Sequence, residues 1–265
     1  EVFDTTPYTI LVVDDNPDMT DFLKRTFEGY FKRIIIAGDG VEALQLVRSH
    51  VPDIIVSDVM MPRMNGYKLC KTIKEDINIS HIPVILLTAR DDRQSQISGY
   101  KNGADGYLSK PFEVEMLMEL IRNRLKNREY TKKRYLNAGL IPTPEESTIS
   151  LTDETFLIKL NSIIQENIEN SNLGIQFICQ EVGLGRSSLY NKLKALTGMG
   201  ANEYISKLRI EKAITLISGT DMPFSEIAEK TGFTTPSYFS TAFKQYTGET
   251  PSQYKERKKK GLAGK

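Results

Sequence analysis

Residues 53–66, DIIVSDVMMPRMNG, contain a short apolar run that ends at a carboxylate and opens into a loop. The β-branched residues at 54–56 are followed too closely by Pro62 for a helix, so the run predicts a strand buried on both faces. Asp58 would then lie at the carboxyl end of a central parallel strand, where open α/β sheets place their chemistry. An aspartate at a strand end is more often a turn or capping residue, so the rest of the chain has to decide its role.

Strands and helices are predicted to alternate five times along the first half of the chain. Buried apolar runs predict strands at residues 8–13, 33–37, 54–58, 83–87 and 104–108. Capped or amphipathic segments between them predict helices at residues 17–30, 40–49, 66–77, 92–102 and 114–125. This alternation requires right-handed crossovers and predicts an α/β fold, a doubly wound parallel sheet of five strands.

Five polar side chains lie at the ends of these strands, and the carboxyl ends of parallel strands meet at one edge of a sheet. They are Asp14 and Asp15 after the first strand, Asp58 in the third, Thr88 after the fourth and Lys110 after the fifth. Three carboxylates brought together repel one another unless a cation joins them, and hard oxygen ligands suit Mg²⁺. Asp58 is then a candidate nucleophile that forms an acyl phosphate, with Lys110 and Thr88 available to bind the phosphoryl oxygens.

Residues 8–126 resemble the receiver domain of response regulators over its full length. The resemblance rests on these strand-end residues, in this order, and on the MMPRMNG loop. It implies a flavodoxin-like fold and phosphorylation of Asp58 by the phosphohistidine of a partner histidine kinase. The implied Mg²⁺ ligands are Asp14, Asp15, Asp58 and the backbone carbonyl of Met60. The implied phosphoryl-binding and switch residues are Thr88, Ala89, Tyr107 and Lys110, with a cis peptide bond between Lys110 and Pro111.

Two other interpretations of the acidic site remain. A degenerate receiver keeps the fold without the chemistry, although no member of the expected set is missing here. A phosphatase with an aspartate nucleophile commonly carries a second carboxylate two residues later as its general acid, whereas Asp58 is followed by Val59 and Met60. We therefore expect no enzyme activity beyond the domain's own phosphorylation and dephosphorylation, with the kinase elsewhere.

The composition is that of a globular protein with two domains. Its 265 residues are 40% apolar and 26% charged, and no apolar run is long enough to span a membrane. The two cysteines, Cys70 and Cys179, form no zinc-binding or disulfide pattern, which fits a reducing cytoplasm. Residues 1–125 carry 15 Lys and Arg against 19 Asp and Glu, and residues 126–265 carry 20 against 15. This asymmetry favours contact between the second half and a polyanion.

One sequence unit occurs twice in the second half, after a segment at 127–150 that loses helical periodicity and contains Pro142 and Pro144. The pattern IxxxxGL at 178–184 recurs 49 residues later as IxxxxGF, and LxxxLKxxTG at 189–198 recurs 50 residues later as FxxxFKxxTG. Each copy predicts a short helix, a turn with glycine and a second helix, which is helix-turn-helix geometry. A long helix at 202–218 is predicted between the copies.

The second helix of each copy divides into an apolar and a polar face. The residues expected to face inward are Leu189, Leu193, Leu196, Phe239, Phe243 and Tyr246. The opposite face carries side chains that can hydrogen-bond to base edges and phosphates. The candidate DNA contacts are Arg186, Ser187, Tyr190, Asn191, Lys194, Thr235, Ser237, Ser240, Thr241, Lys244 and Gln245. For any one of them, an ordinary solvated helix face is an equally good interpretation.

Residues 151–257 resemble the AraC-type DNA-binding domain, in which a long helix joins two helix-turn-helix units. The signature lies in the second unit, IAEKTGFTTPSYFSTAFKQYTGETPSQY at residues 227–254, and the first unit is plainer. The resemblance implies two recognition helices in successive major grooves of double-stranded DNA, roughly 34 Å apart. The expected organisation is an N-terminal segment at 1–7, a receiver at 8–126, a linker at 127–150, a DNA-binding domain at 151–257 and an unstructured basic tail at 258–265.

These resemblances together imply a cytoplasmic transcription regulator of a two-component system, controlled by phosphorylation of Asp58. Its expected partners are a histidine kinase, double-stranded DNA, RNA polymerase and, after phosphorylation, a second copy of the chain, without direct membrane contact. The domain order, and Glu1 in place of an initial Met, resemble the C-terminal part of hybrid systems, in which a membrane-bound sensor, a kinase and a regulator share one chain. The alternative is a DNA-binding protein that acts without phosphorylation and uses its receiver as a protein-interaction module.

Overall fold

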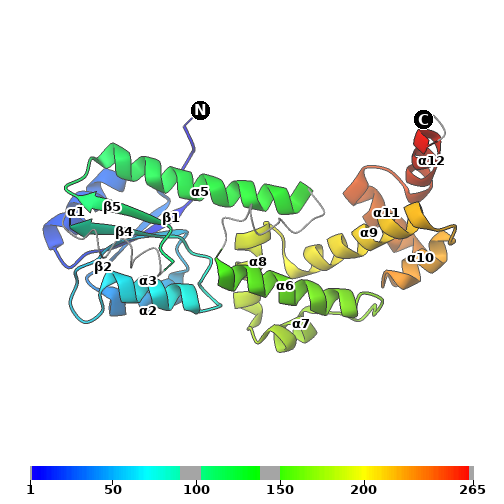
Figure 1. Cartoon of the computed structure of the whole chain (residues 1–265), viewed down its shortest axis with the longest axis horizontal. Helices are drawn as coiled ribbons and strands as arrows, with labels where there is room; N and C mark the ends of the chain where they lie inside the picture. Colours follow the sequence, from blue (N-terminus) through cyan, green and yellow to red (C-terminus); the bar gives the residue numbers. More distant parts are fainter. Residues whose placement is uncertain (1, 90–102, 138–149, 263–265) are drawn as a thin grey trace. The chain divides into compact units, whose positions relative to one another are not determined.

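The computed structural model describes residues 2–89, 103–137 and 150–262. The chain divides into two compact units, residues 1–133 with 143–154 and residues 134–142 with 155–265. The first unit contains a parallel sheet, and the second is helical throughout the residues described there (Figure 1). The predicted helix at 92–102 and residues 138–149 of the predicted linker lie outside the described residues.

The sheet of the first unit has five parallel strands in the order β2-β1-β3-β4-β5. The strands are β1 (Thr9–Val13), β2 (Arg33–Ala37), β3 (Ile54–Asp58), β4 (Val84–Ala89) and β5 (Gly106–Lys110). The chain passes from β1 to β2 on one side and then places β3 on the other side of β1, so the strand order reverses between β1 and β3. Open α/β sheets bind their ligands at such a reversal, beyond the carboxyl ends of the strands.

Helices cover both faces of the sheet, as the doubly wound prediction requires (Figure 1). They are α1 (Pro17–Phe27), α2 (Gly40–His50), α3 (Gly66–Glu75) and α5 (Val114–Asn137). The apolar residues of α1 and α5 form one cluster with Ile10 and Val12 of β1, whereas those of α2 and α3 form another with Leu11 and Val13. Successive residues of a strand point to opposite faces, so each buried strand contributes to both clusters.

Side-chain caps start the first three helices close to the strands that precede them. The caps are Asn16, Asp39 and Asn65, which accept hydrogen bonds from the backbone N–H groups of Asp18, of Val41 and Glu42, and of Lys68. Each cap satisfies backbone donors that have no partner within the helix. The caps therefore fix the loops at the carboxyl edge of the sheet.

Two strands continue beyond the apolar runs that predicted them. β4 ends at Ala89 and β5 at Lys110, whereas the predicted ends were residues 87 and 108. The parallel pairing persists, with Thr88 opposite Ser109 and Ala89 opposite Lys110. Backbone hydrogen bonding rather than side-chain hydrophobicity decides where these strands end, and the polar residues at their ends are held within the sheet.

Seven helices follow in the residues described from 150 onward. They are α6 (Leu151–Glu166), α7 (Ile175–Val182), α8 (Arg186–Thr197), α9 (Ala201–Gly219), α10 (Phe224–Lys230), α11 (Pro236–Thr247) and α12 (Pro251–Leu262). The pairs α7–α8 and α10–α11 are the two predicted helix-turn-helix units, and α9 is the long helix between them (Figure 1). Gly183 and Gly232, in the two turns, have φ angles of +73° and +71°, a left-handed conformation that favours glycine.

A run of aromatic side chains holds the second helix-turn-helix unit together. The ring centroid of Phe239 lies 5.4 Å from that of Phe233 and 5.7 Å from that of Phe243. The ring of Phe243 in turn lies 5.6 Å from that of Tyr254 on α12. These contacts fix the inner face of α11 against α12 and the turn before it, and the opposite face of α11 stays exposed.

Two predictions about the second half are wrong. Tyr246 does not face inward; it is 38% exposed, and its hydroxyl donates to the Glu211 carboxylate at 3.2 Å, because a phenol keeps its polar end near a partner. The basic segment from residue 258 is not unstructured, since it continues α12 to Leu262. Lysine and arginine are good helix formers, so the helix that starts at Pro251 is not interrupted by them. No helix in the described ranges is both long and apolar enough to cross a membrane.

Candidate functional site

Side chains from three strands meet at the carboxyl edge of the sheet, where the strand order reverses. Asp58 is the last residue of β3, Asp14 directly follows β1, and Lys110 is the last residue of β5. The Lys110 ammonium nitrogen lies 2.5 Å from a carboxylate oxygen of Asp58 and 2.9 Å from one of Asp14. The structure thus brings these three predicted residues together, with the ammonium bridging the two carboxylates. The peptide bond between Lys110 and Pro111 is cis, as predicted.

The Asp58 carboxylate is held in an environment poor in water, with 8% of the residue exposed. Its second oxygen accepts a hydrogen bond from the backbone N–H of Met60 at 2.9 Å. Burial raises the pKa of Asp58, and the hydrogen bond and charge of Lys110 offset this only in part. Burial acts to lower the pKa of Lys110, but its bonds to Asp58 and Asp14 prevail and the pKa is raised. The site therefore holds a desolvated carboxylate beside a cation, a combination common at functional sites.

The Lys110 ammonium pairs with two of the three carboxylates predicted to hold Mg²⁺, Asp14 and Asp58. Asp14 is buried and accepts a hydrogen bond from the backbone N–H of Asn16 at 2.9 Å, whereas Asp15 is exposed. Across the ranges that the structure describes, no three Asp, Glu, His or Cys side chains lie close enough to hold a metal ion. The carboxylates still fit Mg²⁺. The negative charge of Asp14 repels that of Asp58 and raises the pKa of Asp58. A divalent cation bound between these hard oxygen ligands would relieve the repulsion.

Three further predicted residues lie on β4 and β5. Thr88 is 1% exposed, and its hydroxyl has no hydrogen-bond partner among the described residues. Buried hydroxyls are nearly always hydrogen-bonded, so this one is available to an incoming ligand. Ala89 is exposed at the end of β4, and Tyr107 is half-buried on β5 opposite Leu86.

The loop after Asp58 is held by contacts that the sequence analysis did not predict. Arg63 forms an ion pair with Asp39, the N-cap of α2, and the backbone N–H of Gly40 donates to a carbonyl of the same loop at 3.1 Å. A Cβ atom at Gly66 would lie 2.2 Å from the backbone oxygen of Asp58. The glycine of the MNG sequence could therefore have indicated the close approach of two backbone segments. Nothing in the sequence indicated the ion pair between Arg63 and Asp39.

Two hollows in the second unit coincide with the predicted DNA-contacting faces. The hollow on α8, of about 550 Å³, is lined by Ile175, Arg186, Ser187, Leu189, Tyr190, Asn191 and Ala201. The hollow on α11, of about 560 Å³, is lined by Ser237, Ser240, Thr241, Lys244, Gln245, Gly248 and Thr250. Every predicted contact is exposed except Ser240, which is half-buried. Lys194 and Thr235 line neither of these two hollows, and the Thr235 side chain caps α11 by accepting from the N–H of Tyr238.

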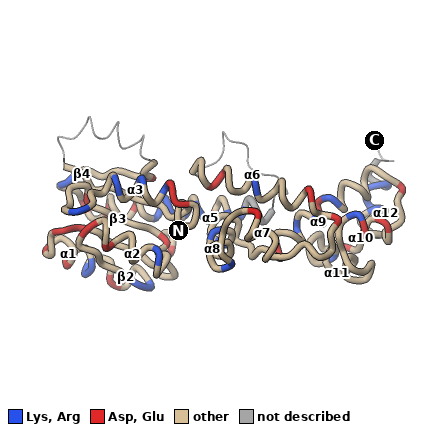
Figure 2. Tube along the Cα trace, turned by 90° about the horizontal axis from the view of Figure 1, so that it is seen from below, with Lys and Arg blue, Asp and Glu red and all other residues tan. Residues whose placement is uncertain are grey.

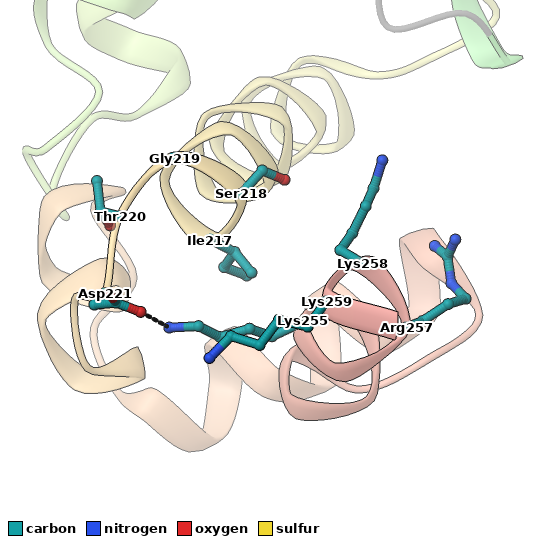
Figure 3. Close-up of a pocket in the computed structure, with 9 residues that line it drawn as sticks. All are labelled: Ile217, Ser218, Gly219, Thr220, Asp221, Lys255, Arg257, Lys258 and Lys259. Carbon is teal, nitrogen blue, oxygen red and sulfur yellow. Dashed lines mark ion pairs between the residues drawn. The ribbon is translucent and has the colours of Figure 1, made fainter. Parts of the chain in front are cut away.

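A third hollow, of about 700 Å³, lies between the C-terminal end of α9 and α12 (Figure 3). The cations that line it are Lys255, Arg257, Lys258 and Lys259. Lys255 pairs with Asp221 at 3.5 Å and Arg257 with Glu249 at 2.7 Å, so the surplus positive charge rests on the other two lysines. Figure 2 shows Lys and Arg along α12. This basic surface arises because the predicted tail is helical.

Two of the buried cations in the second unit make contacts that were not predicted. Lys192 on α8 is fully buried, with its ammonium nitrogen 5.1 Å from the ring centroid of Phe156. Arg209 on α9 is 8% exposed and donates to the backbone carbonyl of Asn170 at 2.7 Å. In an amphipathic pattern, Lys and Arg indicate the solvated face, so the sequence offered no signal for either.

Comparison with known proteins identifies both halves of the chain. The family model for the response regulator receiver domain matches residues 10–122, and a model for a helix-turn-helix domain matches residues 178–257. Histidine kinase P4 of Formosa agariphila is 41% identical over 249 residues, which cover 94% of this chain and 18% of that protein. The chain thus corresponds to a small part of this relative.

Two response regulators extend the comparison. The response regulator MprA of Mycobacterium sp. (strain KMS) is 36% identical over 165 residues, which cover 57% of this chain and 70% of that protein. Among solved structures, the C-terminal domain of AraT, a response regulator from Geobacillus stearothermophilus, is 31% identical with a TM-score of 0.37 and covers 38% of this chain and 84% of that one. This chain therefore belongs to the response regulators of two-component systems, and it joins a receiver domain to an AraC-type helix-turn-helix domain.

Proposed function

We propose that this chain is a sequence-specific transcription regulator whose DNA binding is controlled by phosphorylation of Asp58. The observation that supports this most directly is the setting of Asp58. It is buried at the end of the central strand, 2.5 Å from the Lys110 ammonium and next to Asp14. We assign residues 8–126 to the receiver and 151–257 to the DNA-binding domain, with 127–150 as the linker and 258–262 as the basic end of the last helix.

In the proposed reaction, a carboxylate oxygen of Asp58 attacks the phosphorus of a phosphohistidine on a partner histidine kinase. A P–O bond forms as the P–N bond breaks, and the imidazole leaves with the electron pair and takes a proton from solvent. The Lys110 ammonium offsets the negative charge that the phosphoryl group brings. The buried Thr88 hydroxyl, which has no partner among the described residues, donates a hydrogen bond to a phosphoryl oxygen.

Asp14, Asp15, Asp58 and the backbone carbonyl of Met60 would hold Mg²⁺, which supplies positive charge to the phosphoryl oxygens when it is bound. The Met60 N–H and the Lys110 ammonium orient the Asp58 carboxylate from the protein side. We expect removal of Mg²⁺ with a chelator to abolish labelling of the protein by a small acyl-phosphate donor, and re-addition to restore it. Labelling that is equally fast in excess chelator would contradict the metal assignment.

The response of the receiver depends on the negative charge that phosphorylation adds to Asp58, about 1.5 to 2 units. We propose that Thr88, Ala89 and Tyr107 respond to this charge and that two phosphorylated receivers then pair. Pairing brings two DNA-binding domains onto neighbouring sites, where they contact RNA polymerase. The similarity to Histidine kinase P4 supports a kinase in the same polypeptide, as in hybrid systems.

The deciding experiment is capture of genomic DNA fragments by the protein in Mg²⁺, with and without an acyl-phosphate donor. Asp58→Asn is the matched variant, because it removes the nucleophile and keeps the side-chain shape. We expect the donor to enrich specific fragments with the wild-type protein and not with the variant. Equal capture of the same fragments by both proteins would favour the alternative, a regulator that binds DNA without phosphorylation. If neither protein enriches any fragment with or without the donor, the assignment of a DNA reader is contradicted.

A further inference from the structure

We propose that Arg209 on α9 is a positioning residue: it fastens the segment after α6 to the second helix-turn-helix unit and thereby fixes the half-site spacing that the chain accepts. This segment, residues 167–174, joins α6 to α7. The claim about half-site spacing rests on the proposed function, because only a chain that meets DNA with both units has a preferred spacing. The placement of the two units can be measured without DNA.

The long helix α9 does not by itself fix how the two units are placed. Its residues Ile210 and Ala213 share a core cluster with Phe239 and Phe243 of α11, so α9 is part of the core of the second unit. The helix α8 of the first unit is joined to α9 by residues 198–200, and a short connection leaves the angle between two helices to their side-chain contacts. Contacts between the first unit and α9 therefore decide the placement.

The first unit is attached to α9 partly through α6. The Lys192 ammonium of α8 lies 5.1 Å from the ring centroid of Phe156 on α6. The Tyr204 hydroxyl, near the start of α9, donates to the side-chain oxygen of Asn161 on α6 at 2.8 Å. A tie at one point leaves α6 able to pivot about it, and α8 would move with α6. A second tie further along α9 removes this freedom.

Arg209 supplies that second tie. Its guanidinium donates to the backbone carbonyl of Asn170, in the segment after α6, at 2.7 Å. The same guanidinium lies 5.9 Å from the ring centroid of Phe233, in the turn before α11. The Phe233 ring in turn lies 5.7 Å from that of Tyr238 and 5.4 Å from that of Phe239, both on α11. Arg209 thus contacts the segment after α6 and reaches α11 through one intervening ring.

Burial makes the position of Arg209 hard to change. The residue is 8% exposed, and burial lowers its pKa. If the segment after α6 moved away, the buried guanidinium would lose its acceptor on Asn170, which is unfavourable. The neighbouring ion pair between Lys212 and Glu169, at 3.1 Å, joins α9 to the same segment but lies in solvent, where such pairs contribute little.

The internal repeat offers a comparison of the two units at equivalent glycines. Gly183 and Gly232 have φ angles of +73° and +71°. A Cβ atom at Gly232 would clash with the backbone oxygen of Ile168 and lie 2.9 Å from a guanidinium nitrogen of Arg209, whereas a Cβ atom at Gly183 would meet nothing within 4 Å. The turn of the second unit therefore packs directly against the segment after α6, at the place where Arg209 holds it.

The first measurement is the distance between the two parts in the full-length chain without DNA. Spin labels on Ser162→Cys in α6 and Glu256→Cys in α12, both exposed positions, report this distance by pulsed electron paramagnetic resonance. Cys179→Ser removes the half-exposed native thiol in every protein, and Cys70 is fully buried. We expect a narrow distance distribution for this labelled parent.

The variant Arg209→Met keeps the length of the side chain and removes its donors and charge. We expect its distance distribution to be about twofold wider than that of the parent, because the acceptor on Asn170 no longer holds the segment. Lys212→Ala removes the exposed ion pair to the same segment and should leave the distribution unchanged. Thermal unfolding checks that the variants are folded.

The two glycines provide a matched pair that leaves Arg209 in place. Gly232→Ala and Gly183→Ala impose the same left-handed strain, but only the first drives a Cβ atom against the segment after α6. We expect Gly232→Ala to shift the mean distance between the labels and Gly183→Ala to leave it unchanged.

The second measurement is the half-site spacing on DNA, in Mg²⁺ with an acyl-phosphate donor. The site recovered by genomic capture is compared, by fluorescence anisotropy, with the same duplex carrying one base pair more or one fewer between its half-sites. One base pair moves a half-site by about 3.4 Å and turns it by about a tenth of a helical turn. We expect the wild type to prefer the natural spacing about tenfold and Arg209→Met to prefer it less than about threefold. A mere loss of folded protein lowers binding to all three duplexes alike and leaves this ratio unchanged.

Each outcome decides one part of the proposal. An unchanged distance distribution in Arg209→Met would overturn the positioning role. A wider distribution with an unchanged spacing preference would overturn the effect on DNA. If none of the proteins binds any duplex, the proposed function fails and the spacing claim falls with it, whereas the distance measurement still decides whether Arg209 holds the two units in one placement.

Discussion

The hydroxyl of Thr88 is buried at the proposed phosphoacceptor site and has no hydrogen-bond partner in the described ranges. A buried polar group without a partner lowers stability, and an apolar group of the same shape removes that cost. We expect Thr88→Val to raise the free energy of unfolding by about 1 kcal/mol, measured by urea titration. The same change should shorten the lifetime of the phosphorylated protein, whereas Thr88→Ser should leave both properties close to the wild type. A Thr88→Val protein that is less stable than the wild type would show that the hydroxyl is satisfied after all.

Gly66 lies at the start of α3, against the backbone of the proposed phosphoacceptor. A Cβ atom there would be 2.2 Å from the Asp58 backbone oxygen and 3.0 Å from the Cα of Val59. Because the obstacle is backbone, the strand or the helix has to shift. We expect Gly66→Ala to lower the free energy of unfolding by about 1–3 kcal/mol and to slow phosphorylation of Asp58. Gly29→Ala, at a position with a positive φ and open space, controls for backbone strain alone.

At the scale of elements, the Asp39 carboxylate makes two interactions, a helix cap and an ion pair, and substitutions can weaken one or remove both. One carboxylate oxygen caps α2 through the N–H groups of Val41 and Glu42, and the other pairs with Arg63 in the loop after Asp58. Asp39→Asn keeps a capping oxygen and weakens the ion pair, whereas Asp39→Ala removes both. We expect the alanine variant to lose about 1 kcal/mol of stability in thermal unfolding and the asparagine variant to lose less.

The loop contact itself is tested by Arg63→Ala, which leaves the α2 cap intact. The loop carries the Met60 N–H that orients the Asp58 carboxylate. We expect the variant to be phosphorylated more slowly by an acyl-phosphate donor than the wild type, with an unchanged unfolding midpoint because Arg63 is mostly exposed. An unchanged phosphorylation rate would show that the loop holds its place without the ion pair.

The elements that the sequence predicted best are those whose position follows from topology. Parallel strands necessarily bring their carboxyl ends to one edge, so Asp14, Asp58 and Lys110 could be placed together from strand ends alone. Tyr246 could not be placed in this way. A tyrosine has an apolar ring and a polar tip, and its setting depends on whether a partner such as Glu211, 35 residues away, is within reach.

At the scale of the whole molecule, the length of α9 constrains the DNA that the two units can share. The helix has 19 residues, or about 28 Å at the usual rise, and it joins the two helix-turn-helix units. Insertion of five base pairs between the two half-sites turns one of them by about half a helical turn. We expect this insertion to lower affinity to that of a single unit, and insertion of a full turn to have the same effect, because α9 cannot lengthen. Electrophoretic mobility titrations against the unmodified site measure both.

Assembly is the second property that belongs to the whole chain. If phosphorylated receivers pair, addition of a phosphoryl mimic with Mg²⁺ should double the mass seen in sedimentation, and Asp58→Asn should stay at the original mass. The phosphoryl mimic brings negative charge to Asp58. Among the described residues, the only close ion-pair partner of Asp58 is Lys110. An unchanged sedimentation profile for the wild type would contradict pairing. The effect of phosphorylation would then have to be a change in the DNA affinity of a single copy of the chain.

Lys192 gives α8 an orientation that a purely hydrophobic inner face would not. An ammonium group can be buried only where a partner meets it, and here it lies over the ring of Phe156. A leucine at this position would stay buried after a small rotation of α8 about its own axis. The same rotation would move the Lys192 ammonium away from the Phe156 ring and is therefore unfavourable. The buried charge of Lys192 therefore helps to set which way the exposed side chains of α8, the proposed DNA contacts, point. A new specificity grafted onto α8 has to keep Lys192, or the grafted residues will not point at the bases they were chosen for.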